Sequence, residues 1–182
     1  MDITDTLYIT NRADWRQWLT DNHATAREIW LIYYSKQSGK ARIPYLEAVE
    51  EALCFGWIDG IEKKIDSERS AQRFTPRRPK SNWTELNKER ARRLIANGQM
   101  TKAGLAKVPD LSIDAFRIPD DIRAALEADP QAWANFQQFS PLYQRIRIGF
   151  IDEVRKQSTV FQKRLAYFIK MTAENKQYGV ME

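Results

Sequence analysis

The chain has 182 residues, of which 43% are hydrophobic and 29% charged, with one cysteine and a formal net charge of +5. This composition excludes an intrinsically disordered chain, and the length allows a buried core without disulfides or metals. One cysteine excludes an internal disulfide, the N-terminus is acidic where a signal peptide is basic, and no apolar run reaches bilayer length. We therefore expect a cytoplasmic protein with no transmembrane segment.

The N-terminal half predicts strands and helices in alternation. Residues 6–10 form a short strand, and Asn11 caps a helix that turns Trp15, Trp18 and Leu19 inward. Residues 28–35 are rich in β-branched and aromatic side chains and predict a second strand. A helix then begins at Pro44 and ends where Gly56 adopts a left-handed conformation. Residues 57–65 and 70–75 predict a hairpin that turns at 66–69.

The rest of the chain predicts helices. One spans residues 84–97 before Gly98, a short one follows Thr101, and residues 108–118 form a linker. Further helices start at Pro119, at Asp129-Pro130 and at Ser140-Pro141, and the last covers residues 159–175. The predicted fold class is α+β, a small mixed or antiparallel sheet with helices in residues 1–108, followed by a helical subdomain in residues 109–182.

Positive charge is concentrated in two segments. Residues 73–93 hold eight lysines and arginines against two glutamates, and residues 143–170 hold seven against two acids, whereas residues 110–135 are acidic. Such runs are often solvated helix surfaces, but a basic face that attracts anions is the alternative. The sequence isoelectric point of about 9.3 suits either.

The clearest candidate site is the loop at residues 73–81. Arg73, Arg77, Arg78 and Lys80 are its candidate ligand contacts, because flanking prolines hold the guanidinium groups on a loop and such groups suit phosphate or carboxylate. Ser81 and Asn87 add neutral hydrogen bonds near the start of the next helix. The alternative is a salt-bridged strap over the hairpin.

Aromatic and acidic residues extend this candidate site. Trp57 and Trp83 form a stacking platform for a base or sugar, unless they belong to the core. Asp59 either orients Arg77 or Arg78 or contacts a ligand itself. On a regular strand Asp59 and Glu62 face opposite sides, so they are not an obvious acid/base pair.

The sequence offers little for other chemistry. Cys54 follows a helix, where nothing lowers a thiol pKa, so it is interpreted as a buried structural residue. His23 is the one histidine, which argues against a zinc site or a histidine-based catalytic pair. Nucleotide-binding glycine loops and hydrolase signatures are lacking. We expect no cofactor and no metal, and any enzymatic activity stays open, with the balance against it.

Several motifs together resemble one family. They are Ala52-Leu-Cys-Phe-Gly-Trp-Ile-Asp59, Pro76-Arg-Arg78, Ser81-Asn-Trp83, Asn87 and Gly98-Gln-Met100, followed downstream by Ile118-Pro119, Asp129-Pro130, Ser140-Pro141, Ile151-Asp-Glu153 and Lys163-Arg164. The chain is similar over residues 44–176 to the YdeI/OmpD-associated family, also called OmdA or bacteriocin-protection proteins. The family's basic C-terminal run is replaced here by Thr159-Val-Phe-Gln-Lys-Arg164. The resemblance implies a bacterial protein linked to stress and to tolerance of antimicrobial peptides, without agreed catalytic residues.

Three functions follow from these observations. The first is a tolerance protein that binds an anionic small molecule, a lipid headgroup or an acidic partner at the Arg77-Arg78 loop. The second is a nucleic-acid-binding protein, and the third is an enzyme that uses Asp59 and the arginines on a phosphorylated or carboxylated substrate. A cationic peptide is an unfavourable direct ligand for a cationic loop. The oligomeric state is open.

Overall fold

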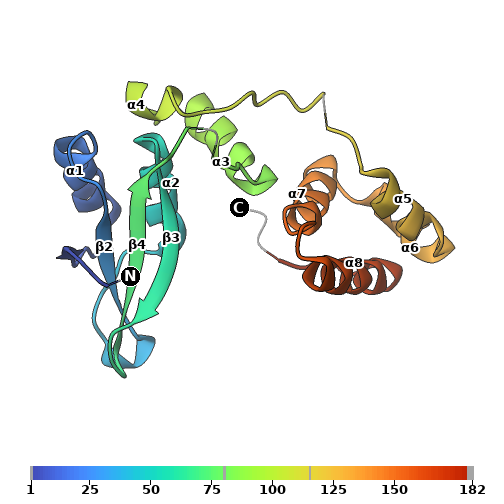
Figure 1. Cartoon of the computed structure of the whole chain (residues 1–182), viewed down its shortest axis with the longest axis horizontal. Coiled ribbons are helices and arrows are strands. Elements are labelled where there is room, and N and C mark those ends of the chain that lie inside the picture. Colours follow the sequence, from blue (N-terminus) through green and yellow to red (C-terminus); the bar gives the residue numbers. More distant parts are fainter. Residues whose placement is uncertain (1, 80, 115, 180–182) are drawn as a thin grey trace. The chain divides into compact units, whose positions relative to one another are not determined.

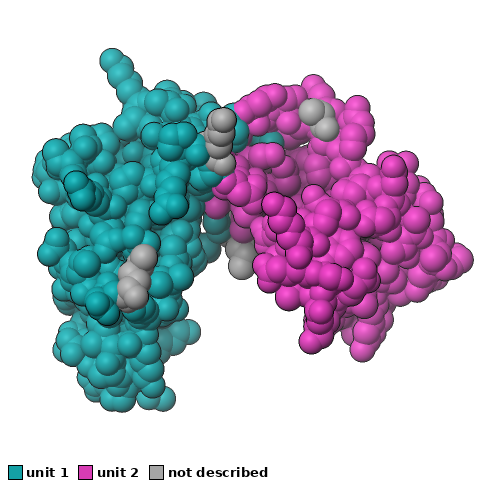
Figure 2. Space-filling view, viewed as in Figure 1, with its two compact units in different colours: residues 1–81, 90–109 teal, residues 82–89, 110–182 magenta. Residues whose placement is uncertain are grey.

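The computed structural model describes residues 2–79, 81–114 and 116–179, which divide into two compact units. Unit 1 comprises Met1–Ser81 and Arg90–Pro109, and unit 2 comprises Asn82–Glu89 and Asp110–Glu182 (Figure 2). The chain thus returns once to unit 1 before it continues into unit 2. The division into domains at residues 108 and 109 stays a prediction.

The sheet belongs to unit 1. In the described part of the chain it has four strands in the order β1-β2-β4-β3 (Figure 1), namely β1 (Thr6–Leu7), β2 (Ile29–Tyr34), β3 (Trp57–Lys64) and β4 (Arg69–Pro76). Strand β1 pairs with β2 in parallel, and the other pairs are antiparallel. The sheet is therefore mixed, and the predicted hairpin is confirmed as β3 and β4.

Helices of unit 1 begin and end where local signals place them. They are α1 (Arg12–Asn22), α2 (Tyr45–Cys54), α3 (Glu85–Ala96) and α4 (Lys102–Leu105), with a 3-10 turn, η1 (Lys36–Ser38). The Asn11 side chain accepts a hydrogen bond from the Asp14 amide at 2.9 Å, as predicted for an N-cap. Gly56 and Gly98 have φ of 74° and 66°, so both adopt the left-handed conformation that glycine favours.

Unit 2 is helical in its described residues. It contains the first turn of α3 and the helices α5 (Asp120–Glu127), α6 (Pro130–Gln138), α7 (Pro141–Asp152) and α8 (Ser158–Ala173). Asp129 and Ser140 cap α6 and α7 as predicted. A sheet with helices followed by a helical part confirms the predicted α+β class. None of the helices in the described ranges has the length and apolar character that crossing a bilayer requires.

Each unit has its own core. In unit 1, α1 and α2 pack with the sheet around buried aromatic and aliphatic side chains, including Trp15, Leu19, Trp30, Leu53 and Phe74. In unit 2, the helices enclose a cluster that contains Ile122, Leu126, Phe136, Tyr143, Ile151 and Phe168. The burial of these side chains supplies most of the free energy of folding of each unit.

Candidate functional site

A β-bulge brings two carboxylates to one face of the sheet. Asp59 pairs with Phe74 and Glu62 pairs with Gln72, although Asp59 and Glu62 are three positions apart on β3 and Gln72 and Phe74 are only two positions apart on β4. Because Phe74 and Gln72 share a face of β4, Asp59 and Glu62 share that face too. The prediction that they face opposite sides was wrong. Gly60, inside the bulge, is the sequence signal that could have revealed it.

This face of the sheet carries a cavity beside the start of α2. Its volume is about 360 Å³, and we call it the Tyr45 cavity after the residue at its rim. The residues that line it come from β2, β3, β4, the first residue of α2 and the segment before it, and they are Tyr33, Arg42, Pro44, Tyr45, Glu62 and Gln72. Its size suits a small molecule, and its walls combine tyrosine rings with an amide and opposite charges.

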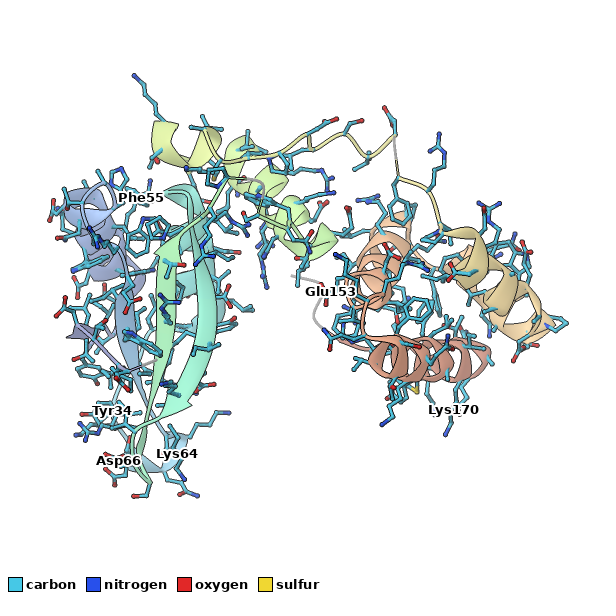
Figure 3. The ribbon with its side chains drawn as sticks, in the orientation of Figure 1. Tyr34, Phe55, Lys64, Asp66, Glu153 and Lys170 are labelled. Atoms are coloured by element: carbon cyan, nitrogen blue, oxygen red, sulfur yellow. The ribbon has the colours of Figure 1, made fainter. Side chains whose placement is uncertain are left out.

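A second cavity continues from the Tyr45 cavity toward the turn of the hairpin. Its volume is about 410 Å³, and both cavities are lined by Tyr33, Arg42 and Glu62. Its remaining lining includes Tyr34, Lys64 and Asp66, which Figure 3 shows together at the turn end of β3 and β4, with Phe55 at the opposite end of unit 1. Because the two cavities share three lining residues, we call them together the groove of unit 1.

Tyr33 lies between the two cavities and is nearly buried, with 7% of its surface exposed. Its hydroxyl group is buried and makes no hydrogen bond within the described residues. Burial raises the pKa of Tyr33 well above its ordinary value; nearby Arg42 lowers it in part, whereas Asp59 and Glu62 raise it. A buried hydroxyl without a partner costs about 1–3 kcal/mol, so this side of the cavity is not optimised for stability.

Tyr45 and Asp59 form a short hydrogen bond near the cavity. The Tyr45 hydroxyl donates to Asp59 Oδ2 at 2.5 Å. Burial, and then this hydrogen bond to a carboxylate, raise the pKa of Tyr45, which stays a neutral donor at physiological pH. The pair holds the Tyr45 ring at the rim of the cavity.

Two buried arginines lie near this pair. Arg77 and Arg90 are 3% and 7% exposed. Burial lowers the pKa of Arg77 to about 10, against the opposing effect of Asp59. Burial also lowers the pKa of Arg90, while Tyr45, Glu50 and Asp59 act in the opposite direction. Asp59 acts on both guanidinium groups, so this end of the site combines buried cations with a carboxylate.

The predicted loop is brought together only in part. The Arg77 guanidinium donates to Ser81 Oγ at 3.3 Å, and its backbone N–H donates to the Gly56 carbonyl at 2.8 Å. Arg78 is exposed, and ligand contact there stays a prediction. Lys80 lies outside the described residues. Arg77 is thus a buried structural cation beside Asp59 and not an exposed fork on a loop.

Two predicted residues of unit 1 have structural partners. The Arg73 Nε donates to Glu28 at 2.8 Å, and Arg73 pairs with Trp30 in the register, on the face opposite the Tyr45 cavity. Trp57 is 1% exposed and its indole N–H donates to the His23 carbonyl at 3.1 Å. Trp57 is therefore a core residue, as the alternative interpretation held, and its ring offers no face for stacking.

Trp83 and Asn87 belong to unit 2. Trp83 precedes α3, and Asn87 lies in its first turn. The Asn87 backbone N–H donates to Thr84 Oγ1 at 3.1 Å, and both predicted residues are partly buried. Their proposed contacts with a ligand stay predictions. Across the described ranges, no three histidine, cysteine, aspartate or glutamate side chains are grouped as a metal ion requires.

The residues that line the Tyr45 cavity were not in the predicted set. They come from separate stretches of the chain, at residue 33, at residues 42–45 and at residues 62–72, and strand pairing and the bulge bring Tyr33, Glu62 and Gln72 to one face. The local signals were the paired tyrosines of β2 and the Pro44-Tyr45 dipeptide at a helix start. Neither signal reveals a cavity without the register of the sheet.

Comparison with protein families gave two matches. Residues 7–107 match the family described as "Domain of unknown function (DUF8412)", and residues 115–175 match "Bacteriocin-protection, YdeI or OmpD-Associated". The second match confirms the resemblance to OmdA and confines it to the C-terminal part, while the motifs in residues 52–100 fall within the first. Searches of curated proteins and of solved structures found no match.

Proposed function

This chain belongs to the family described as "Domain of unknown function (DUF8412)", with an OmdA segment at residues 115–175, and from that premise we propose a function in tolerance. The protein is of the YdeI/OmpD-associated type, and it supports tolerance of antimicrobial peptides by binding a small molecule in the Tyr45 cavity. The name of the second family supports the biological role, and the geometry of unit 1 supports the binding.

One observation carries the proposal. The Tyr45 cavity places a guanidinium, a carboxylate and two tyrosines around a space of about 360 Å³. Small-molecule sites are concave, combine aromatic walls with a few polar groups and begin at about 300 Å³. The cavity has these properties without any contribution from unit 2.

The ligand is not the antimicrobial peptide itself. The Tyr45 cavity has a volume of about 360 Å³, which suits a small molecule and not a peptide chain. A small metabolite whose binding changes the state of the protein fits better than sequestration of the peptide. This interpretation replaces the Arg77-Arg78 loop with the cavity as the binding site.

Survival assays test the proposal. A bacterial strain that expresses the chain is challenged with polymyxin B, beside strains with empty vector, Tyr45→Ala and Leu105→Ala. Leu105 is a matched control, because its side chain is 47% exposed in unit 1, away from the cavity lining, and Tyr45 is 45% exposed. We expect protection from the wild type and Leu105→Ala and its loss with Tyr45→Ala. Full protection by Tyr45→Ala would exclude the cavity, and no protection by the wild type would exclude the role.

A second candidate function, nucleic-acid binding, has one specific observation in its favour. Lys163 and Lys170 are exposed two turns apart on α8, with the half-exposed Tyr167 between them. Lysines spaced along a helix suit successive phosphates, and a tyrosine can stack on a base. Figure 3 shows Lys170 directed away from the body of α8.

Fluorescence anisotropy with labelled single-stranded RNA, single-stranded DNA and duplex DNA separates this candidate from the first. Binding that weakens steeply between low and near-physiological salt, and that is lost in Lys163→Gln/Lys170→Gln but kept in Arg123→Gln, would support it. No binding at low salt would remove it. Arg78→Ala tests the exposed arginine of the loop in the same assay.

A further inference from the structure

Opposite charges face each other across the groove of unit 1. Arg42 Nη1 donates to the Tyr34 carbonyl at 3.1 Å, and its guanidinium lies 5.9 Å from the centre of the Tyr33 ring, which places it on the β2 side. Glu62 lies on β3, and β4 runs between the two strands. Two strand spacings separate β2 from β3 by about 10 Å.

Neither charge is fully used within the protein. Among the residues that the structure describes, the Glu62 side chain makes no hydrogen bond or ion pair, and the Arg42 guanidinium has its bond to the Tyr34 carbonyl and its contact with the Tyr33 ring but no carboxylate partner. Other acids of unit 1 are committed to arginines, as Glu28 is to Arg73 and Glu51 is to Arg12 and Arg16. Single exposed charges are normally solvated, but these two line both cavities together with Tyr33.

From this juxtaposition we propose that the Tyr45 cavity binds a small zwitterion with an amine and a carboxylate, which is an amino acid or a dipeptide. The proposal rests on the proposed function and names the class of its ligand. The ammonium group contacts the Glu62 carboxylate, the carboxylate contacts the Arg42 guanidinium, and the side chain lies against the rings of Tyr33 and Tyr45.

The dimensions of the groove agree with this class. The charged ends of an extended dipeptide lie within about 7 Å of each other. Arg42, in the segment before α2, and Glu62, on β3, both line the two cavities. The Tyr45 cavity holds one residue, and the adjoining cavity of about 410 Å³ leaves room for a second. A ligand with a single charge can form an ion pair with Arg42 or with Glu62, but not with both.

Isothermal titration calorimetry of the full chain tests the proposal with four probes. L-phenylalanine and glycyl-L-phenylalanine carry both charges, whereas 3-phenylpropionate lacks the amine and phenethylamine lacks the carboxylate. One charge-assisted contact at an exposed rim changes affinity about tenfold. Of L-phenylalanine and glycyl-L-phenylalanine, we expect the one with the higher affinity to bind about tenfold more tightly than either singly charged analogue.

Charge-neutral variants assign each contact. Glu62→Gln should weaken the binding of L-phenylalanine about tenfold and leave the binding of 3-phenylpropionate unchanged. Arg42→Gln should also weaken the binding of L-phenylalanine about tenfold, and it should leave the binding of phenethylamine unchanged. Glu127→Gln and Arg123→Gln are matched controls on α5, where both side chains are exposed, and should have no effect. Circular dichroism confirms that each variant is folded.

The other outcomes overturn the inference. Equal binding of L-phenylalanine and 3-phenylpropionate, with no effect of Glu62→Gln, would identify an anion site in the same cavity. That result would leave the proposed function standing. Binding of none of the four probes would also overturn the zwitterion, and the survival of Tyr45→Ala strains would then decide separately whether the cavity has a function.

Discussion

The Cys54 thiol shows how burial decides reactivity at a single residue. Cys54 is fully buried at the end of α2, and burial, followed by the charge of Glu51, raises its thiol pKa from 9.0 to about 11. The thiol is therefore protonated at pH 8, and we expect iodoacetamide to leave it unmodified until urea unfolds the chain. Mass spectrometry with and without urea measures this, and rapid modification of the native protein would contradict it.

The raised pKa of the Cys54 thiol also makes the free energy of unfolding depend on pH. The folded state binds the thiol proton more tightly than the unfolded state, so this contribution is complete below pH 9 and is lost as the pH rises through 11. Above pH 9 the unfolded chain releases the proton first. Urea unfolding of wild type and Cys54→Ala between pH 8 and 10 isolates the effect, because the variant lacks the thiol and should lose less stability with pH.

Glu51 is the residue on which we expect the largest electrostatic effect. It is 1% exposed and accepts hydrogen bonds from Arg12 Nε at 2.5 Å and from Arg16 Nη1 at 2.7 Å. Removal of the partner of a buried charge costs about 3–5 kcal/mol, and both arginines are partly exposed, so we expect Glu51→Gln to lose about 3 kcal/mol. Urea unfolding measures this against Glu47→Gln, whose unchanged stability is the control.

The residue scale also shows what the sequence could not indicate. Arg77 was expected to contact a ligand from a loop that prolines stiffen, and its guanidinium is buried beside Asp59. The sequence did not indicate that Glu51 is buried, because exposed glutamates occur at similar positions on helices. Burial of a charged residue depends on partners from other elements, here Arg12 and Arg16 of α1, and no local pattern specifies them.

At the scale of elements, the junction of α2 and α4 depends on a glycine. The Cβ of an alanine at position 104 would overlap the Cys54 carbonyl oxygen and lie 2.9 Å from the Leu53 carbonyl oxygen. These atoms are backbone, so α4 must move away from the end of α2. We expect Gly104→Ala to lose about 3 kcal/mol, at the upper end for overpacking, measured by urea unfolding.

Gly39 provides the control for this prediction. It has φ of 68°, and a Cβ there meets no atom within 4 Å. Gly39→Ala therefore carries only the cost of the left-handed backbone, about 1–2 kcal/mol. If the two variants lose the same stability, backbone strain and not the contact between α2 and α4 explains both effects.

Element boundaries were largely predictable, whereas the arrangement of elements was not. The Asn11, Asp129 and Ser140 caps and the left-handed Gly56 and Gly98 are local, because the side chain and the backbone groups that it binds lie within a few residues. The Tyr45 cavity depends on the pairing of Tyr33 with Ser70 and of Glu62 with Gln72, and on a bulge. That information is contained in the register and not in any short window.

On the scale of the whole molecule, α3 is shared by the two units. Its first turn belongs to unit 2, where Glu89 pairs with Arg145 at 3.4 Å and Glu85 packs where a Cβ on Gly149 would be too close. Its remaining turns belong to unit 1, where Ala91 and Leu94 are buried. One continuous helix therefore receives tertiary packing from two cores.

This sharing predicts how far a defect in unit 2 spreads. Phe136 is buried between Trp133 and Phe168, so Phe136→Ala should destabilise unit 2 by about 3–5 kcal/mol. The first turn of α3 then loses its partners, and its amide hydrogens should exchange faster. The amides of β2 and β4 should keep their protection, because a helix end can fray while the remaining structure stays folded. Hydrogen exchange with mass spectrometry follows both regions. Equal loss of protection in β2 and β4 would show that the two cores unfold as one cooperative unit.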